Sequence, residues 1–382
     1  MKVFRIIGLA ILSSFVFGFA MQMSIPTFTV YLSQLNVPLE FIGGISLGLA
    51  LSALIFRPIA AHMIHKFGAT LTSLGGALIS IISFLGYALF PQIIPVIILR
   101  VLQGISVGIF TTAVPTLIAQ VTPKDQLIKV MGYSSLSGAA AAAFGPFLGL
   151  YLIAGGSFNS LFMVGLLLNG VALMLMLPLF KVNPQEDNLD EKPQGSSNIF
   201  KSEALFPSIV IGVMMFVQSG IMAFISLHGK AMGLDNIGFY FIFNFVGLIF
   251  SRLTTTWLTQ KLSLKLIILI HGLILASSMY ALSVSSTLIA WAIIAVTLGY
   301  AFNVLFVILN TMALKNISHT LKGKANALFF GAIDMGFFMG GLIWGVIAKA
   351  SSIAFVYQIG SGLLLLLTFS VMFFIQQRKI KF

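Results

Sequence analysis

The sequence predicts an all-α membrane protein with twelve transmembrane helices in two six-helix halves that are related by an internal repeat. Of its 382 residues, 59% are apolar and 8% are charged, whereas soluble domains carry about 25% charged residues. Runs of about 20 apolar residues, the length that crosses a bilayer, recur along the chain. The third observation is that one half of the chain aligns with the other.

The repeat is visible when the chain is shifted by 195 positions without a gap. The shift places Arg57 on Arg252 and Gly145 on Gly340. Further matched pairs are Ile42 and Ile237, Lys66 and Lys261, Gly104 and Gly299, Thr116 and Thr311. We therefore expect an N-terminal half over residues 1–180, a cytoplasmic linker over 181–203 and a C-terminal half over 204–382.

The expected helices are the apolar runs between charged or Gly/Pro-marked turns. In the first half they cover residues 6–34, 40–62, 70–90, 93–120, 126–154 and 159–180. In the second half they cover residues 205–229, 236–258, 264–284, 287–314, 324–348 and 353–375.

The repeat identifies the first apolar run as a helix, and composition identifies the segment between the halves as a linker. The basic start and apolar run resemble a signal peptide, but residues 15–34 align by the repeat with residues 210–229, which are internal, so we interpret this run as the first transmembrane helix. Between the halves, the stretch from Lys181 to Lys201 is polar and cannot bury enough apolar surface to order itself. It is expected to be a flexible linker.

The charges predict the orientation. The net charge is +12, which in a soluble protein would suggest nucleic acid. With the N-terminus in the cytoplasm, sixteen of the twenty-one Lys and Arg lie in cytoplasmic segments, three in the membrane, and only Lys230 and Lys349 outside. This positive-inside pattern predicts a multi-pass protein of the inner or plasma membrane with both termini cytoplasmic and no nucleic-acid partner.

Residues 57–68, 99–104 and 132–149 give the chain a resemblance to the major facilitator superfamily over nearly its whole length. After the second helix the family usually carries Gly, an Asp-Arg pair and Gly-Arg-Arg. Here Ala61 stands for the first Gly, His65 for the Asp and Lys66 for the Arg. The resemblance implies that His65 and Lys66 take part in gating; a basic turn that merely obeys the positive-inside rule is the alternative.

The segment Leu99-Arg100-Val101-Leu102-Gln103-Gly104 resembles the family's fourth-helix motif, in which a buried Arg is tied to proton coupling or substrate charge. Arg100 lies roughly two turns from the outer end of its helix. An arginine that only snorkels to the interface is the alternative.

Residues 132–149 resemble the fifth-helix signature of the family's antiporters. Pro146 removes a backbone donor and bends the helix, while the Gly/Ala face lets a neighbour approach closely. We expect Gly145, Pro146 and Gly149 to serve conformational change, with generic small-residue packing as the alternative.

Of nine Asp and Glu residues, only Asp334 lies in the middle of a predicted membrane helix. Intramembrane ionisable residues are costly and usually functional, so Asp334 is the candidate proton carrier. In the family fold its helix borders the second helix, which makes Arg57 its expected partner; a purely structural Asp-Arg pair is the alternative. His228 and His271 titrate in the right range but are more often ordinary interior residues.

Polar side chains inside the helices are expected to face a central cavity or another helix. The candidate substrate-binding residues are Arg100, Gln22, Gln103, Gln218, Asn244, Arg252, Tyr300 and Asn303.

These observations predict a secondary transporter that works by alternating access and exports a small anionic or zwitterionic amphipathic metabolite against protons. Three arginines within the helices against one Asp favour an anion, and the profile resembles the branch that includes exporters of carboxylate-rich metallophores. Multidrug or sugar efflux is the alternative, and a non-transporting receptor or scramblase is a weaker one. No cysteine, metal cluster, nucleophile with its base, or nucleotide-binding motif is present. We therefore expect no enzyme, no cofactor and no metal site, and a monomer in the bilayer.

Overall fold

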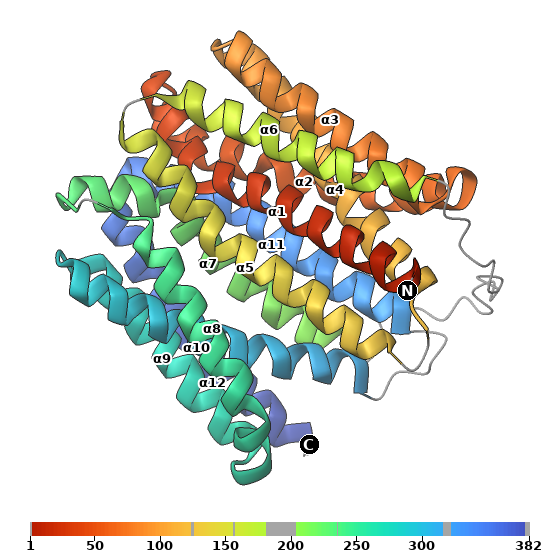
Figure 1. Ribbon diagram of the computed structural model, residues 1–382. Coiled ribbons are helices and arrows are strands. Elements are labelled where there is room, and N and C mark those ends of the chain that lie inside the picture. The colour runs from red at the N-terminus through yellow and green to blue at the C-terminus, as the bar shows by residue number, and fades with distance from the viewer. Residues whose placement is uncertain are drawn as a thin grey trace. The chain divides into compact units, whose positions relative to one another are not determined.

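The computed structural model consists of helices joined by short connections (Figure 1). It describes residues 2–123, 126–155, 157–180, 204–234, 236–315 and 322–378. The expected linker, 181–203, therefore lies outside the described residues, as do the chain end at 379–382 and Asp235.

Twelve long helices occupy the described residues. Those of the first half are α1 (Lys2–Gln34), α2 (Leu39–Phe67), α3 (Ala69–Leu89), α4 (Ile93–Val121), α5 (Leu127–Ala154) and α6 (Phe158–Met176), with a short 3₁₀ turn, η1 (Leu177–Leu179). Those of the second half are α7 (Leu205–Ala231), α8 (Phe239–Lys261), α9 (Leu264–Val284), α10 (Leu288–Lys315), α11 (Lys322–Ala350) and α12 (Ile353–Arg378).

All twelve helices are long and apolar enough to cross a membrane. The expected boundaries agree to within a few residues, with one consequential difference. α2 was expected to end at residue 62 but continues to Phe67, and Gly68, at φ +82°, ends it. Because glycine adopts a positive φ without steric cost, the helix stops there, and His65 and Lys66 lie in its last turn.

The described chain divides into two compact units. One contains residues 2–38 and 45–180, and the other contains residues 39–44 and 204–378. The first turn and a half of α2 therefore group with the second unit and the rest of α2 with the first.

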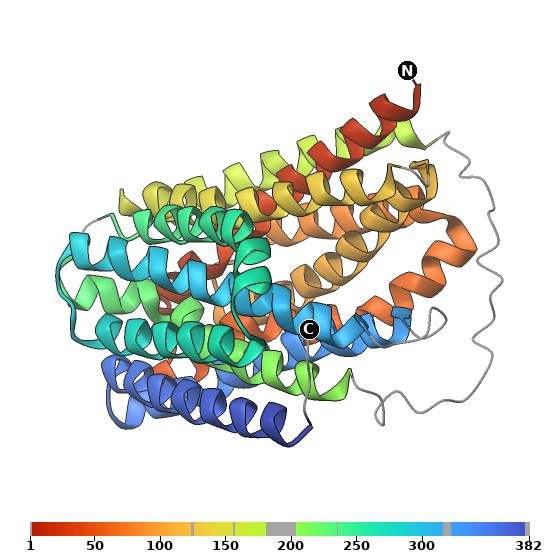
Figure 2. The ribbon, with the colours of Figure 1, turned by 90° about the horizontal axis from the view of Figure 1, so that it is seen from below.

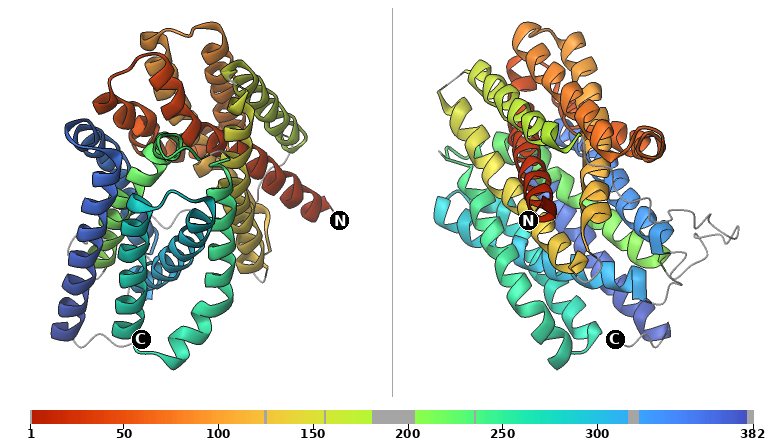
Figure 3. Two further views of the ribbon diagram at one scale, coloured as in Figure 1. Left: turned by 90° about the vertical axis from the view of Figure 1, so that its left-hand side faces the viewer. Right: turned by 45° about the vertical axis from the view of Figure 1, so that its right-hand side comes forward.

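In the first unit α1 lies between α5 and α6 (Figure 1). Glycines set the closest approaches between helices. A Cβ atom on Gly145 of α5 would lie 2.8 Å from the carbonyl oxygen of Phe19 in α1. A Cβ on Gly104 of α4 would lie 2.5 Å from that of Leu49 in α2. α3 lies alongside α4 and α6 (Figure 3).

In the second unit α7 packs on α11, α8 on α10, and α9 on α12; α9 and α12 run side by side in Figure 2. Glycines again mark the crossings. A Cβ on Gly247 of α8 would lie 2.6 Å from the Tyr300 nitrogen of α10, and Gly336 of α11 approaches the Gly212 carbonyl of α7. Small residues let membrane helices come together in this way.

Candidate transport site

Arg100 is the most completely enclosed charged group in the described chain. It lies on the eighth residue of α4, two turns into the helix, and its side chain is 2% exposed. A charged group inside a membrane helix costs several kcal/mol unless it is paired or hydrated. The surroundings of Arg100 must therefore supply its partners.

Those partners are neutral oxygen atoms. The guanidinium donates Nε–H to the carbonyl oxygen of Ser46 at 3.0 Å, and Nη2 donates to the same oxygen. Nη1 donates to Oε1 of Gln103 at 2.7 Å and, more weakly, to Oγ of Ser24 at 3.5 Å. The guanidinium has five N–H groups, and it forms these four hydrogen bonds within the first unit.

Gln103 extends the network, because it stands one turn after Arg100 on the same face of α4. Its Oε1 also accepts a hydrogen bond from the Tyr87 hydroxyl at 3.0 Å, and its Nε2 donates to Ser24 Oγ at 3.2 Å. Gln103 and Tyr87 are buried. The network therefore joins α1, α2, α3 and α4.

Aromatic rings close the site. The Arg100 guanidinium carbon lies 4.0 Å from the centre of the Phe28 ring, a cation–π contact. Phe28 packs edge-on against Tyr87, at 5.3 Å between ring centres, and Tyr87 packs against Phe162 of α6 at 5.2 Å. A desolvated cation–π contact contributes about 2 kcal/mol.

No carboxylate of the described residues forms an ion pair with Arg100. Its positive charge is solvated by dipoles and a ring face and is not neutralised. Because the side chain is enclosed, it does not snorkel to the interface. The alternative of a snorkelling arginine is therefore wrong.

Of the three arginines within the predicted membrane helices, Arg100 alone is buried. Arg57 of α2 is half-buried, and Arg252 of α8 is exposed. The apolar sequence around Arg252 predicted a place within a membrane helix, and the residue does lie in α8, but with an exposed side chain. Its expected role in substrate binding stays a prediction.

Asp334 stands in the middle of α11 and is half-buried. It belongs to the second unit, whereas Arg57 belongs to the first. Their expected pairing therefore stays a prediction. Gln22 of α1 and Gln218 of α7 are also half-buried, one in each unit.

The polar residues expected in the second half form hydrogen bonds within their own unit. Asn244 of α8 donates to the Ala295 carbonyl oxygen of α10 at 3.3 Å, and Asn303 donates to that of Gly299 in its own helix at 2.8 Å. The Tyr300 hydroxyl accepts from Thr254 at 3.2 Å. These side chains satisfy helix contacts within the second unit and form no network around a charge.

The two buried histidines sit in packed interiors. His228 Nε2 donates to the Leu282 carbonyl oxygen at 3.2 Å, and its ring lies between Trp291 and Tyr357. His271 Nδ1 donates to the carbonyl oxygen of Ile267 one turn earlier at 2.7 Å. Both environments match ordinary interior histidines.

The small-residue face of α5 contacts α1 of the same unit. Gly145 and Gly149 lie against the α1 backbone at Phe19 and Met23. The helix continues through Pro146 from Leu127 to Ala154. The packing expected of this face is present, and its role in conformational change stays a prediction.

Charged side chains lie at both ends of α2. His65 and Lys66 end α2 with exposed side chains.

Glu40, in the first turn of α2, forms an ion pair with Lys349 near the end of α11, at 2.6 Å between Oε1 and Nζ. Nothing in the sequence indicated this pair. The pair stays within the second unit.

Sequence reasoning missed the remaining partners of Arg100. Ser24, Ser46, Tyr87 and Phe28 come from three other helices, and serine and aromatic residues are too common in membrane helices to stand out. The only local signal was Gln103, three residues after Arg100 and thus on the same helix face.

Two six-helix halves related by a sequence repeat are an architecture of secondary transporters. Comparison with known proteins gives the family. Residues 10–322 match the model of the Major Facilitator Superfamily, and the chain belongs to this family. Its members are transporters, so the protein is a transporter and not an enzyme.

The similar sequences include transporters of bacteria and archaea. The chain is 24% identical over 286 residues to the uncharacterized MFS-type transporter MJ1560 of Methanocaldococcus jannaschii, covering 72% of this chain and 74% of that one. It is 30% identical to the uncharacterized MFS-type transporter YvkA of Bacillus subtilis, over 36% of this chain and only 31% of that relative. It is 26% identical to the quinolone resistance protein NorA of Staphylococcus aureus, over 53% of this chain and 52% of NorA.

The fold is also that of solved transporters. The nucleoside transporter NupG superposes with a TM-score of 0.77 at 14% identity, covering 97% of this chain and 99% of that one. A D-xylose-proton symporter superposes with a TM-score of 0.74 at 16% identity, covering 96% and 97%. At these identities the likeness shows the fold alone.

Proposed function

We propose that this transporter exports small anionic or zwitterionic amphipathic molecules in exchange for protons, by alternating access of its two halves. The observation that carries the proposal is the enclosed charge of Arg100, which no described carboxylate neutralises.

The electrostatic argument concerns the first unit. A positive charge surrounded by apolar helices acts through a low effective dielectric constant, so its attraction for an anion reaches further than in water. Because most of its N–H groups are already engaged by protein, Arg100 acts as a positioning residue and a source of positive potential. Direct bidentate grip of a carboxylate would require Ser46 or Gln103 to give up its bond.

The direction of transport is supported by two relatives. NorA is named as a quinolone resistance protein, and PmrA of Streptococcus pneumoniae, 28% identical over 36% of this chain, as a multi-drug resistance efflux pump. A quinolone carries a carboxylate and a basic amine and so fits the proposed class. A carboxylate-rich metallophore is a second member of the same class.

Asp334 is the proposed proton carrier. It is half-buried in the middle of α11, in a segment that contains no other acidic residue. A carboxyl group in such a place can bind and release a proton as its access to water changes.

Substrate class is tested in sealed vesicles that contain the purified protein and an imposed pH gradient. We expect a fluorescent quinolone to be accumulated and a permanent cation without a carboxylate, such as ethidium, to be left behind. Equal accumulation of both compounds would contradict the anion preference and indicate broad multidrug efflux.

Coupling is tested with Asp334→Asn, which keeps the shape of the side chain but cannot titrate. We expect binding and downhill exchange of the quinolone to persist, while uphill accumulation driven by the pH gradient disappears. Asp334→Glu is the matched control and should retain part of the uphill transport. If Asp334→Asn still concentrates the substrate, the carrier is another group, and His228 and His271 are the next to test.

A further inference from the structure

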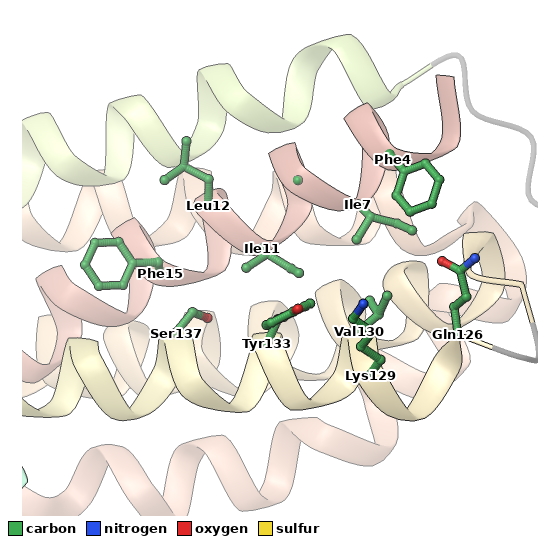
Figure 4. A pocket seen from close by; sticks show the side chains of 11 residues that line it. Phe4, Ile7, Ile11, Leu12, Phe15, Gln126, Lys129, Val130, Tyr133 and Ser137 are labelled. Carbon is green, nitrogen blue, oxygen red and sulfur yellow. The ribbon is translucent and has the colours of Figure 1, made fainter. Parts of the chain in front are cut away.

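A groove opens between the first turns of α1 and α5 in the first unit (Figure 4). It has a volume of about 470 Å³, within the range of small-molecule sites. It lies apart from the Arg100 network, and none of the residues assigned above to transport lines it.

One wall of the groove is an apolar face of α1. Phe4, Ile7, Ile11 and Phe15 recur at spacings of three and four residues and so follow one side of the helix. At 1.5 Å per residue this wall is about 16 Å long, close to the length of an extended acyl chain of a dozen carbons. Gly8, also in the wall, has no atom within 4 Å of the place where its Cβ would be, which leaves open space beside the helix.

The opposite wall carries the polar groups. Figure 4 shows Lys129 and Tyr133 on α5, and Gln126 just before it, near the end where both helices begin. Lys129 is exposed and forms no ion pair with any described residue. The groove thus combines a long apolar wall with a lysine at one end that no described carboxylate pairs with.

The geometry points to a binding site for an anionic phospholipid, with one acyl chain along α1 and the phosphate at Lys129. Two observations favour this occupant. The apolar wall has the length of an acyl chain, and the charged end lies where α1 and α5 both begin, which is the basic end of α1 with Arg5. Basic pockets between membrane helices bind anionic headgroups in this way.

The charge is tested by native mass spectrometry of the purified protein with phosphatidylglycerol and, separately, phosphatidylcholine. We expect phosphatidylglycerol to bind the wild type more tightly than phosphatidylcholine. Lys129→Gln should weaken phosphatidylglycerol about fivefold, the effect of one basic residue near an anionic lipid. Lys261→Gln, which removes an exposed lysine at the end of α8, is the matched control and should leave this binding unchanged.

The groove itself is tested with Gly8→Leu, whose side chain enters the open space beside α1. We expect phosphatidylglycerol binding to fall about tenfold, because the leucine occupies the place of several methylene groups. Gly170→Leu is the control, since Gly170 of α6 is also a helical glycine with no atom within 4 Å of its Cβ position. Both variants should melt at or above the wild-type temperature, because leucine is a better helix former than glycine.

Three outcomes would overturn the proposal. They are equal binding of the two lipids to the wild type, unchanged phosphatidylglycerol binding by Gly8→Leu, or the same loss with Lys261→Gln as with Lys129→Gln. None of them bears on the transport proposal, which rests on Arg100 and Asp334.

Discussion

The two halves have the same fold but differ in chemistry at equivalent positions. Under the 195-residue shift, Arg100 falls on Ala295 and Gln103 on Leu298. Both second-half residues are buried and apolar. The polar network of the first unit therefore has no counterpart in the second.

The helix crossing beneath that network is nevertheless retained. Gly104 meets the Leu49 carbonyl oxygen in the first unit, and its equivalent Gly299 meets that of Asn244 in the second. Leu49 and Asn244 are themselves equivalent under the shift. The repeat thus preserves where backbones touch and leaves the side chains beside the contact free to change. A duplicated fold can in this way assign positive charge to one half and a titratable acid, Asp334, to the other.

The largest expected effect on stability comes from replacing Arg100 by alanine, the residue at the equivalent position of the second unit. Arg100→Ala removes the donor that Gln103 and Ser46 share and leaves buried acceptors with fewer partners. We expect a loss of about 3 kcal/mol or more in the free energy of unfolding, together with loss of transport. The measurement is the midpoint of thermal unfolding in detergent, with Arg5→Ala, an exposed arginine, as a control that should hardly change it.

The same comparison supplies a rescue. The triple variant Arg100→Ala, Gln103→Leu and Tyr87→Leu carries the residues found at Ala295, Leu298 and Leu282. Replacing Gln103 and Tyr87 by apolar groups as well removes two of the polar side chains that Arg100→Ala leaves with fewer partners, so its stability should exceed that of Arg100→Ala while transport stays lost. A triple variant less stable than the single one would show that the network stabilises the fold by more than its own hydrogen bonds.

A second contrast concerns the α5 and α11 helices, where Gly149 is equivalent to Trp344. Gly149→Ala places a methyl group against the Met23 carbonyl of α1. We expect overpacking to cost about 1–3 kcal/mol, seen as a lower unfolding midpoint. Gly138→Ala in the same helix has no atom within 4 Å and should be neutral or slightly stabilising. Equal midpoints for the two variants would mean that α1 and α5 can separate without cost.

The smallest expected effect concerns Trp344 of α11, the residue equivalent to Gly149. Trp344 is buried and donates Nε1–H to the Phe216 carbonyl oxygen of α7 at 2.7 Å. Trp344→Phe deletes this hydrogen bond and keeps much of the ring, so we expect about 1 kcal/mol of destabilisation. A loss as large as that of Gly149→Ala would show that indole volume, not the hydrogen bond, holds α7 to α11.

The fold could be predicted almost completely from the sequence because the bilayer permits few alternatives. Apolar length alone specifies a spanning helix, and the 195-residue repeat specified the two halves. The end of α2 was misplaced by five residues, since the cluster of basic residues was taken for a turn while Gly68 ends the helix. Charge marks the membrane boundary, whereas backbone conformation decides where a helix stops.

The candidate site could be predicted only in part. Arg100 and Asp334 stand out because charge is rare in membrane helices. The partners of Arg100 are a serine carbonyl, a serine hydroxyl and a tyrosine from three other helices, and only tertiary packing brings these groups together. Arg252 shows the converse limit, because it is equivalent to Arg57 by the repeat and lies in a membrane helix, and yet its side chain is exposed.

The partners of Arg100 also have an order in time. Ser24, Ser46 and Tyr87 lie on α1, α2 and α3, all of which leave the ribosome before α4. Since chains fold from the N-terminus as they are made, the helix with the costly arginine enters a bilayer that already holds the acceptors for it. In a rearranged chain in which α4 is synthesised first, this guanidinium would meet lipid with Gln103 as its one hydrogen-bond partner from the network. The order of the helices in the sequence therefore lowers the cost of inserting the buried charge.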